Sequence, residues 1–133
     1  MSRRKQVIGV VVLVVVGVVA TYGVREYRAE SRLIEADRLR GAGQLDAVIA
    51  LYDEADSIRP RDSRTLNNRG LAFAQKGDFA RALIDFSEAI SVAPYVPFAY
   101  ENRSIAYEKL GQHETAESDA ANGRRVRAKF DGD

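Results

Sequence analysis

A period of 34 residues runs through this chain from residue 29 to residue 130. Equivalent positions at this spacing form four sets: Pro60 and Pro94; Gly43, Gly77 and Gly111; Leu45, Phe79 and His113; and Leu39, Phe73 and Tyr107. Three units without gaps follow, residues 29–62, 63–96 and 97–130. A period of about 20–50 residues indicates units that stack one on the next, and about three units are needed for a stable stack.

Each unit has the pattern of two helices joined by a short turn. Apolar residues recur at helical spacing, a glycine with polar neighbours follows, and a second amphipathic segment completes the unit. In the middle unit, Gly77 can take the left-handed conformation that ends a helix, and Pro94 stops the second helix. Gly70 and Ala82 are small where the two helices must approach each other. We therefore predict an all-α fold.

The middle unit, SRTLNNRGLAFAQKGDFARALIDFSEAISVAPYV, resembles the tetratricopeptide repeat (TPR). The matching positions are Leu66, Gly70, Phe73, Gly77, Asp78, Phe79, Ala82, Phe86, Ala89 and Pro94. The resemblance implies a short TPR α-solenoid of three helix-turn-helix repeats. It also implies that the first helices of the repeats line a concave groove, which is the usual peptide-binding surface of this family.

The two outer units depart from the TPR pattern. Unit one has Arg32, Glu35 and Ala36 at positions where the family has bulky, apolar and glycine residues, and Val48 in place of a small alanine. We expect its first helix to continue directly from the segment before it. In unit three the last helix is polar on most faces, so we predict that it caps the solenoid.

Residues 7–24, which read VIGVVVLVVVGVVATYGV, contain no charge. As a helix with a rise of about 1.5 Å per residue they would span roughly the hydrocarbon core of a bilayer. Valine is a poor helix former in water, but in lipid the backbone must satisfy its own hydrogen bonds. We predict a basic tip at residues 1–6, a transmembrane helix at 7–24 and a TPR domain at 25–133.

The apolar segment fits either a signal anchor or a cleaved signal peptide. Arg3, Arg4 and Lys5 before an apolar run suit both, and Ala20 offers a cleavage point. We favour an anchor, because the run continues past Ala20 and passes into helix-forming sequence without a proline or a linker. Release of a soluble, exported TPR protein near Ala20 is the alternative.

The direction of insertion depends on which basic residues are counted. The basic tip favours a cytoplasmic N-terminus with the repeats outside the cytoplasm. Five arginines just beyond the span favour the reverse: Arg25, Arg28, Arg32, Arg38 and Arg40. We predict the first arrangement, in a bacterial inner membrane, because acidic residues accompany the second group.

The side-chain inventory argues against several function classes. The chain has no cysteine and a single histidine, so we expect no thiolate site, no multi-histidine metal site and no cofactor. Outside the basic tip, 17 basic residues face 19 acidic ones, which does not suit a nucleic-acid partner. The acidic clusters at 53–56 and 114–119 are interpreted as solvated faces, and His113 as a half-buried packing residue. No catalytic residues emerge, so we predict a protein that is not an enzyme.

The TPR resemblance places candidate partner-binding residues on the first helices of units two and three. In unit two they are Arg64, Asn67, Asn68, Leu71 and Gln75. In unit three they are Phe98, Glu101, Asn102, Ile105 and Lys109. The amides of Asn68 and Asn102 lie one period apart and could hold the backbone of a bound peptide, or could instead be solvated or cap neighbouring backbone.

One TPR subtype clamps the C-terminal carboxylate of chaperones with lysines, asparagines and an arginine at set positions of the first helices. The corresponding residues here are Leu33, Asp37, Asn68, Phe98 and Asn102, of which Asn68 alone matches. Because the cations are missing, we expect that ligand to bind poorly.

The predicted function is a membrane-anchored scaffold or assembly factor that binds a protein segment in the TPR groove. The partner is not identified by the sequence. Gly9, Leu13, Gly17 and Thr21 fall four residues apart on one face of the apolar helix, which suggests a possible homo-oligomer through helix packing in the membrane.

Overall fold

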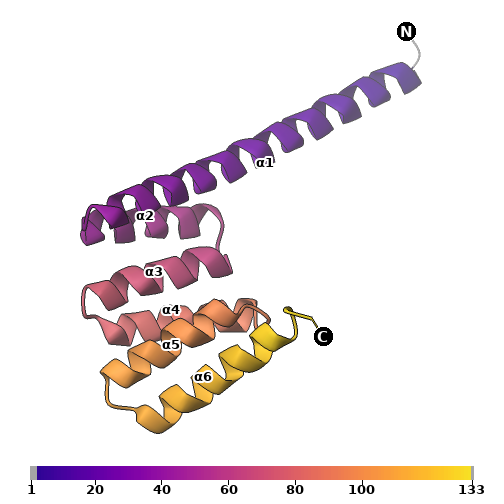
Figure 1. Ribbon diagram of the computed structural model, residues 1–133. Coiled ribbons are helices and arrows are strands. Elements are labelled where there is room, and N and C mark those ends of the chain that lie inside the picture. The colour runs from indigo at the N-terminus through magenta and orange to yellow at the C-terminus, as the bar shows by residue number, and fades with distance from the viewer. Residues whose placement is uncertain (1–2, 133) are drawn as a thin grey trace.

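The computed structural model describes residues 3–132, and it describes side chains from residue 10 onward. Within this range every regular element is an α-helix (Figure 1). The helices are α1 (Arg3–Gly41), α2 (Leu45–Ile58), α3 (Ser63–Gln75), α4 (Phe79–Val92), α5 (Pro97–Lys109) and α6 (His113–Ala128). The side-chain surroundings of the basic tip and of Gly9, the first member of the small-residue stripe, lie outside the described part.

Helix α1 is one element of 39 residues, far longer than the others. Figure 1 shows its N-terminal half projecting away from the stack of shorter helices. Side chains from Val10 to Val24 are exposed, and the first buried residue is Ala29. On length and composition alone, α1 qualifies as a candidate membrane span. The expectation that the first helix of unit one continues directly from the apolar segment is confirmed.

The C-terminal half of α1 and the five shorter helices form three antiparallel hairpins, α1–α2, α3–α4 and α5–α6, each packed chiefly on its neighbours in sequence. Their apolar side chains gather in three small clusters rather than one central core. The buried members are Leu33, Ala36, Val48, Tyr52, Ala55 and Ala72; then Phe73, Ala82, Phe86 and Ala106; then Leu66, Ala89 and Ala99. This arrangement confirms the predicted all-α solenoid of three repeats.

The turn inside each hairpin has the predicted glycine in a left-handed conformation. The φ angles are +74° at Gly43, +82° at Gly77 and +74° at Gly111. In the middle hairpin, Asp78 follows the glycine and accepts a hydrogen bond from the Arg81 backbone N–H at 3.1 Å, which caps the start of α4.

Gly70 marks the close approach of α3 and α4. A Cβ atom at this position would lie 2.6 Å from Cε1 of Phe86, inside van der Waals contact. The prediction that a small residue is needed here is therefore confirmed.

Helix α6 packs on α5 and leaves its polar face to solvent, as expected of the last helix in the stack. Two expectations for this region are wrong. Asp119 is only 4% exposed rather than solvated, because it pairs with an arginine of α5. His113 is not half-buried: its side chain is 74% exposed, since no helix among the described residues lies beyond α6 to cover it.

Candidate functional site

A hollow of about 400 Å³ opens between α3 and α5. Its walls combine polar side chains from the first turns of α3 with apolar side chains around the start of α5. The lining residues are Ser63, Arg64, Asn67, Asn68, Ala89, Val96, Phe98 and Ala99. Four of the ten predicted groove residues thus line one hollow: Arg64, Asn67, Asn68 and Phe98.

Phe98 is the large apolar surface of this hollow. It is the second residue of α5, and 57% of it is exposed although it is a phenylalanine. Pro97 occupies the first turn of α5, where its missing N–H costs no helix hydrogen bond and its fixed φ suits the helix start. The aromatic ring is therefore presented from a well-defined helix end.

The predicted asparagines make side-chain hydrogen bonds between repeats. Nδ2 of Asn102 donates to Oδ1 of Asn67 over 2.9 Å, which joins α5 to α3. Asn68 acts on the Tyr52 hydroxyl of α2, where it opposes the rise that burial causes in the pKa. Asn67, Asn68 and Asn102 are only partly buried, so each amide keeps further donor or acceptor capacity for a ligand.

The buried Tyr52 hydroxyl of α2 also connects two helices. It donates to Oδ1 of Asp37 on α1 over 2.9 Å. Burial, with the hydrogen bond to Asp37, raises the pKa of Tyr52 far above its ordinary value, and the Asn68 hydrogen bond opposes this shift. Asp37, one of the carboxylate-clamp positions, is thus already engaged within the fold.

Two predicted groove residues take part in ion pairs. Arg64 pairs with Glu30 of α1 over 2.5 Å, and Glu101 pairs with Arg127 of α6 over 2.5 Å. The hydrogen bond to Glu30 is the main cause that raises the pKa of Arg64. The guanidinium of Arg127 also lies 5.4 Å from the centre of the Phe98 ring. The C-terminal turn of α6 therefore borders the hollow.

The other predicted residues do not line the hollow. Leu71 is partly buried against the cluster around Phe73. Ile105 is 57% exposed, and Gln75 and Lys109 are exposed at the C-terminal ends of α3 and α5. These residues extend the surface away from the hollow.

The sequence interpretation missed two buried ion pairs that repeat with the period of the chain. Arg69 of α3 holds Asp85 of α4 through two hydrogen bonds of 2.8 Å. Arg103 of α5 holds Asp119 of α6 through bonds of 2.6 and 2.8 Å. Both arginines and both aspartates are 34 residues apart, so the signal was present in the sequence.

Each of these arginines also contacts the helix of the preceding repeat. Nη1 of Arg69 donates to Asp53 of α2 over 2.9 Å, and Nη1 of Arg103 donates to Ser87 of α4 over 3.0 Å. The hydrogen bond to Asp85 is the main cause that raises the pKa of Arg69. The guanidinium thus links three helices behind the groove.

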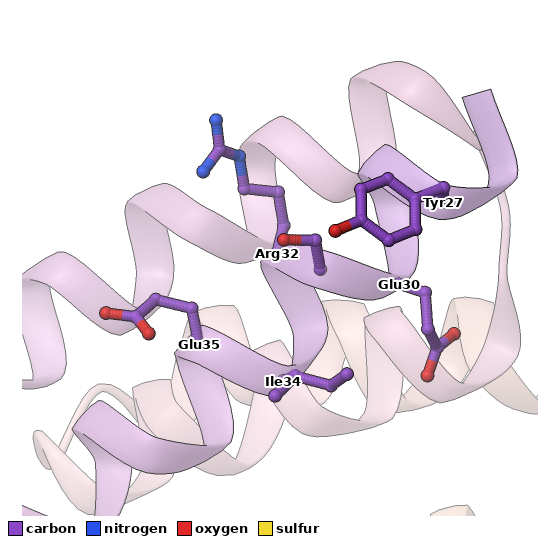
Figure 2. Close-up of a pocket in the computed structure, with 6 residues that line it drawn as sticks. Tyr27, Glu30, Arg32, Ile34 and Glu35 are labelled. Carbon is purple, nitrogen blue, oxygen red and sulfur yellow. The ribbon is translucent and has the colours of Figure 1, made fainter. Parts of the chain in front are cut away.

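A second hollow lies on α1 alone (Figure 2). Its lining residues are Tyr27, Glu30, Ser31, Arg32, Ile34 and Glu35. Tyr27 and Ile34 are largely exposed there. On α3 the positions 34 residues later than Ser31 and Arg32 are Thr65 and Leu66, which are buried. The hollow on α1 is therefore the open first end of the stack.

Among the described residues, no group of three or more histidine, aspartate and glutamate side chains is arranged to hold a metal ion.

Comparisons with known proteins place the repeats in a family. Residues 63–95 match the family model described as Tetratricopeptide repeat. The co-chaperone sgt12 of Aspergillus fumigatus is 33% identical over 87 residues, which are 65% of this chain and 25% of that protein. The Hsp70-Hsp90 organizing protein 3 of Arabidopsis thaliana is 42% identical over 53 residues, 40% of this chain and 10% of that protein. The chain thus spans a quarter or less of the length of these relatives.

Solved structures share the fold at low sequence identity. The TPR2B domain of yeast Sti1 in complex with an Hsp70 peptide has a TM-score of 0.76 at 23% identity, over 78% of this chain and 83% of that one. The first TPR domain of Spaghetti (RPAP3), bound to the HSP90 peptide SRMEEVD, has a TM-score of 0.72 at 22% identity, over 74% and 79%. Residues 63–95 are thus a tetratricopeptide repeat, and the stack of three hairpins has the fold of tetratricopeptide-repeat domains.

Proposed function

We propose that the chain is a membrane-anchored protein–protein interaction module, a scaffold or assembly factor whose groove binds a segment of a partner protein. The observation that carries this proposal is the hollow between α3 and α5, where an exposed Phe98 faces the polar side chains of Arg64, Asn67 and Asn68. Similar TPR domains have been solved with Hsp70 or HSP90 peptides bound, which supports a peptide ligand.

The hollow suits an apolar side chain that is flanked by peptide backbone. Ala89, Val96, Phe98 and Ala99 offer apolar contact, and an aromatic residue of this kind often supplies much of the binding energy at an interface. The amides nearby can pair with backbone N–H and C=O groups of the ligand. We therefore expect a short segment with a central apolar anchor residue.

The role proposed for α1 is to hold this groove beside a bilayer. Ser63 and Phe98 lie in the first turns of α3 and α5, at the end of the solenoid from which α1 projects (Figure 1). Confining the groove and its partner to one membrane surface raises their effective concentration without new contacts. The proposed location is the extracytoplasmic side of a bacterial inner membrane.

The alternative is an exported, soluble TPR protein cleaved near Ala20. One observation favours it: side chains from Val10 to Val24 are exposed, so loss of residues before Thr21 would leave the repeat core intact. The mass of the mature chain discriminates, because an anchored protein keeps the whole segment. The unbroken helix through Ala20 and Thr21 favours the anchor.

A photocrosslinking residue at Phe98 tests the groove directly. The same residue at Ile84, which is exposed on α4 outside the groove, is the matched control. We expect one dominant partner to be captured in cells from position 98, and not from position 84. A peptide copied from the captured segment should bind the purified full chain, and Phe98→Ala should weaken it by about tenfold or more.

Equal capture from both positions, or capture of the chain alone, would refute binding in the groove.

A further inference from the structure

The alternating direction of the helices gathers four segments at one end of the solenoid. The α2–α3 loop, the α4–α5 loop and the C-terminal end of α6 lie on the side toward which the N-terminal half of α1 projects (Figure 1). We call residues 25–28, 59–62, 93–96 and 124–132 the membrane-side rim.

Hydrogen bonds hold the first part of this rim directly beside the apolar segment. Arg25, one residue after Val24, donates through Nη2 to the carbonyl oxygen of Ile58 over 2.6 Å. The next residue, Glu26, pairs with Arg59 over 2.8 Å. The end of α2 is thus fixed at the level where the predicted span ends, with no linker between them.

Charge is unevenly divided between the rim and the rest of the repeats. The rim contains eight basic and three acidic residues. The other positions between residues 29 and 123 contain nine basic and 15 acidic residues. The nearly neutral net charge of the whole chain therefore hides a basic end facing the span and an acidic remainder.

Several rim cations are available for an external partner. Among the described residues Arg28, Arg125 and Lys129 form no ion pair, and Arg125 donates a long hydrogen bond of 3.4 Å to Asn122. Tyr95 and Phe130 belong to the same rim and are 61% and 65% exposed. Exposed aromatic and basic side chains together suit the interfacial region of a membrane.

We propose that the membrane-side rim docks on the anionic phospholipid headgroups of the leaflet from which α1 emerges. This inference rests on the anchoring part of the proposed function. A cation acts on an anionic surface only within about 8 Å at physiological ionic strength. Residues 25–28 and 59–62 are held at the end of the apolar segment by the bonds of Arg25 and Glu26, so their cations lie where such a surface would begin. Docking at several points would fix the direction in which the groove faces.

Proximity to headgroups can be measured with the full chain in lipid nanodiscs. Because the chain has no cysteine, Tyr95→Cys gives a single fluorophore site on the rim, and Gln44→Cys gives one at the opposite end. The nanodiscs contain phosphatidylcholine alone or with phosphatidylglycerol, plus a lipid that carries a nitroxide quencher on its headgroup. We expect phosphatidylglycerol to increase quenching at position 95 and not at position 44.

Charge reversal provides the matched comparison. Arg125→Glu with Lys129→Glu changes the rim, and Arg38→Glu with Lys76→Glu makes the same change in charge at the opposite end. At about fivefold in the docking equilibrium for each basic residue, the rim pair should reduce docking by more than about tenfold. The opposite pair should leave the quenching at position 95 unchanged.

The docking proposal would be overturned if quenching at position 95 did not depend on phosphatidylglycerol, or if it persisted after the rim charges were reversed. It would also be overturned if the only effect of that reversal were the loss of an acidic protein partner. A nitroxide placed deep in the acyl chains and a fluorophore at Val14→Cys report separately whether α1 is inserted. Failure of insertion would refute both the anchor and the rim contact. Insertion without lipid-dependent quenching at position 95 would refute the rim contact alone.

Discussion

Gly70 shows how one hydrogen atom in place of a methyl group sets the distance between two helices. We expect Gly70→Ala to destabilise the repeats by about 1–3 kcal/mol, because the new Cβ would overlap the Phe86 ring and displace it. Gly41→Ala is the control, since nothing lies within 4 Å of a Cβ there. Urea unfolding of the full chain in detergent, followed by circular dichroism, measures both. Equal stability of the Gly70 variant and the parent would contradict the packing described.

Tyr52 should make the repeats sensitive to alkaline pH. The pKa of this buried hydroxyl is raised in the folded chain, so the folded state holds its proton where the unfolded chain releases it. Its contribution is complete below the ordinary tyrosine pKa of about 10 and is lost as pH rises above that value.

Tyr52→Phe should therefore flatten the alkaline part of the stability profile, while Tyr95→Phe, at an exposed tyrosine, should not. The free energy of unfolding measured at several pH values gives the slope for each variant. An unchanged slope in the Tyr52 variant would show that another group is responsible.

The role of a single residue could be predicted from the sequence where it depends only on the repeat that contains the residue. The left-handed turn glycines and the close contact at Gly70 could be predicted because each depends on local geometry. The exposure of His113 could not, because it depends on whether another helix follows. Nor could the hydrogen bond between Asn67 and Asn102, which depends on the angle between neighbouring repeats.

At the scale of helices, the arginine–aspartate pairs connect each hairpin to the one before it. Arg69 is the clearest case, since it reaches both Asp85 in its own repeat and Asp53 in the preceding one. We expect Asp85→Ala to cost about 3 kcal/mol, because it leaves a largely buried guanidinium without its main partner.

A double-mutant cycle separates pairing from burial. Replacing the pair by Arg69→Met and Asp85→Leu should cost less than the sum of the two single changes. Glu35→Ala, which removes the exposed partner of Arg38, should have no measurable effect. Additive effects in the Arg69–Asp85 cycle would mean that the two residues act independently.

Helix pairs and turns followed from the period, but these ion pairs did not follow from the character of the individual residues. Asp119 sits in an acidic segment and looked solvated by composition. Its burial is understood only when the 34-residue spacing of Arg69 and Arg103 is compared with that of Asp85 and Asp119. A search for charged residues that repeat with the period would have found both pairs.

At the scale of the whole molecule, similarity to chaperone-binding domains does not imply the same ligand. The positions of the carboxylate clamp carry Leu33, which is buried, and Asp37, which repels a carboxylate and already accepts a hydrogen bond from Tyr52. We expect the peptide SRMEEVD to bind the purified full chain weakly or not at all, as measured by fluorescence anisotropy.

Two cations introduced into the groove test this reasoning. Phe98→Lys with Asn102→Arg should strengthen binding of that peptide by about tenfold or more, through charge-assisted hydrogen bonds to its carboxylates. The same peptide with an amidated C-terminus should gain less. Tight binding of SRMEEVD to the unmodified chain would show that the groove recognises it by other means.

Because α1 is one unbroken helix, its length determines the direction in which the groove faces relative to the proposed span. Because no flexible linker separates residues 10–24 from the first repeat, any turn of the span about its own axis turns the whole solenoid with it. An α-helix advances about 100° and 1.5 Å per residue. In the proposed anchored arrangement, a single alanine inserted between Val24 and Ala29 would turn the groove by about a quarter-turn while changing its height by only about 1.5 Å. The number of residues in this short stretch would then determine which neighbouring membrane proteins can reach the groove.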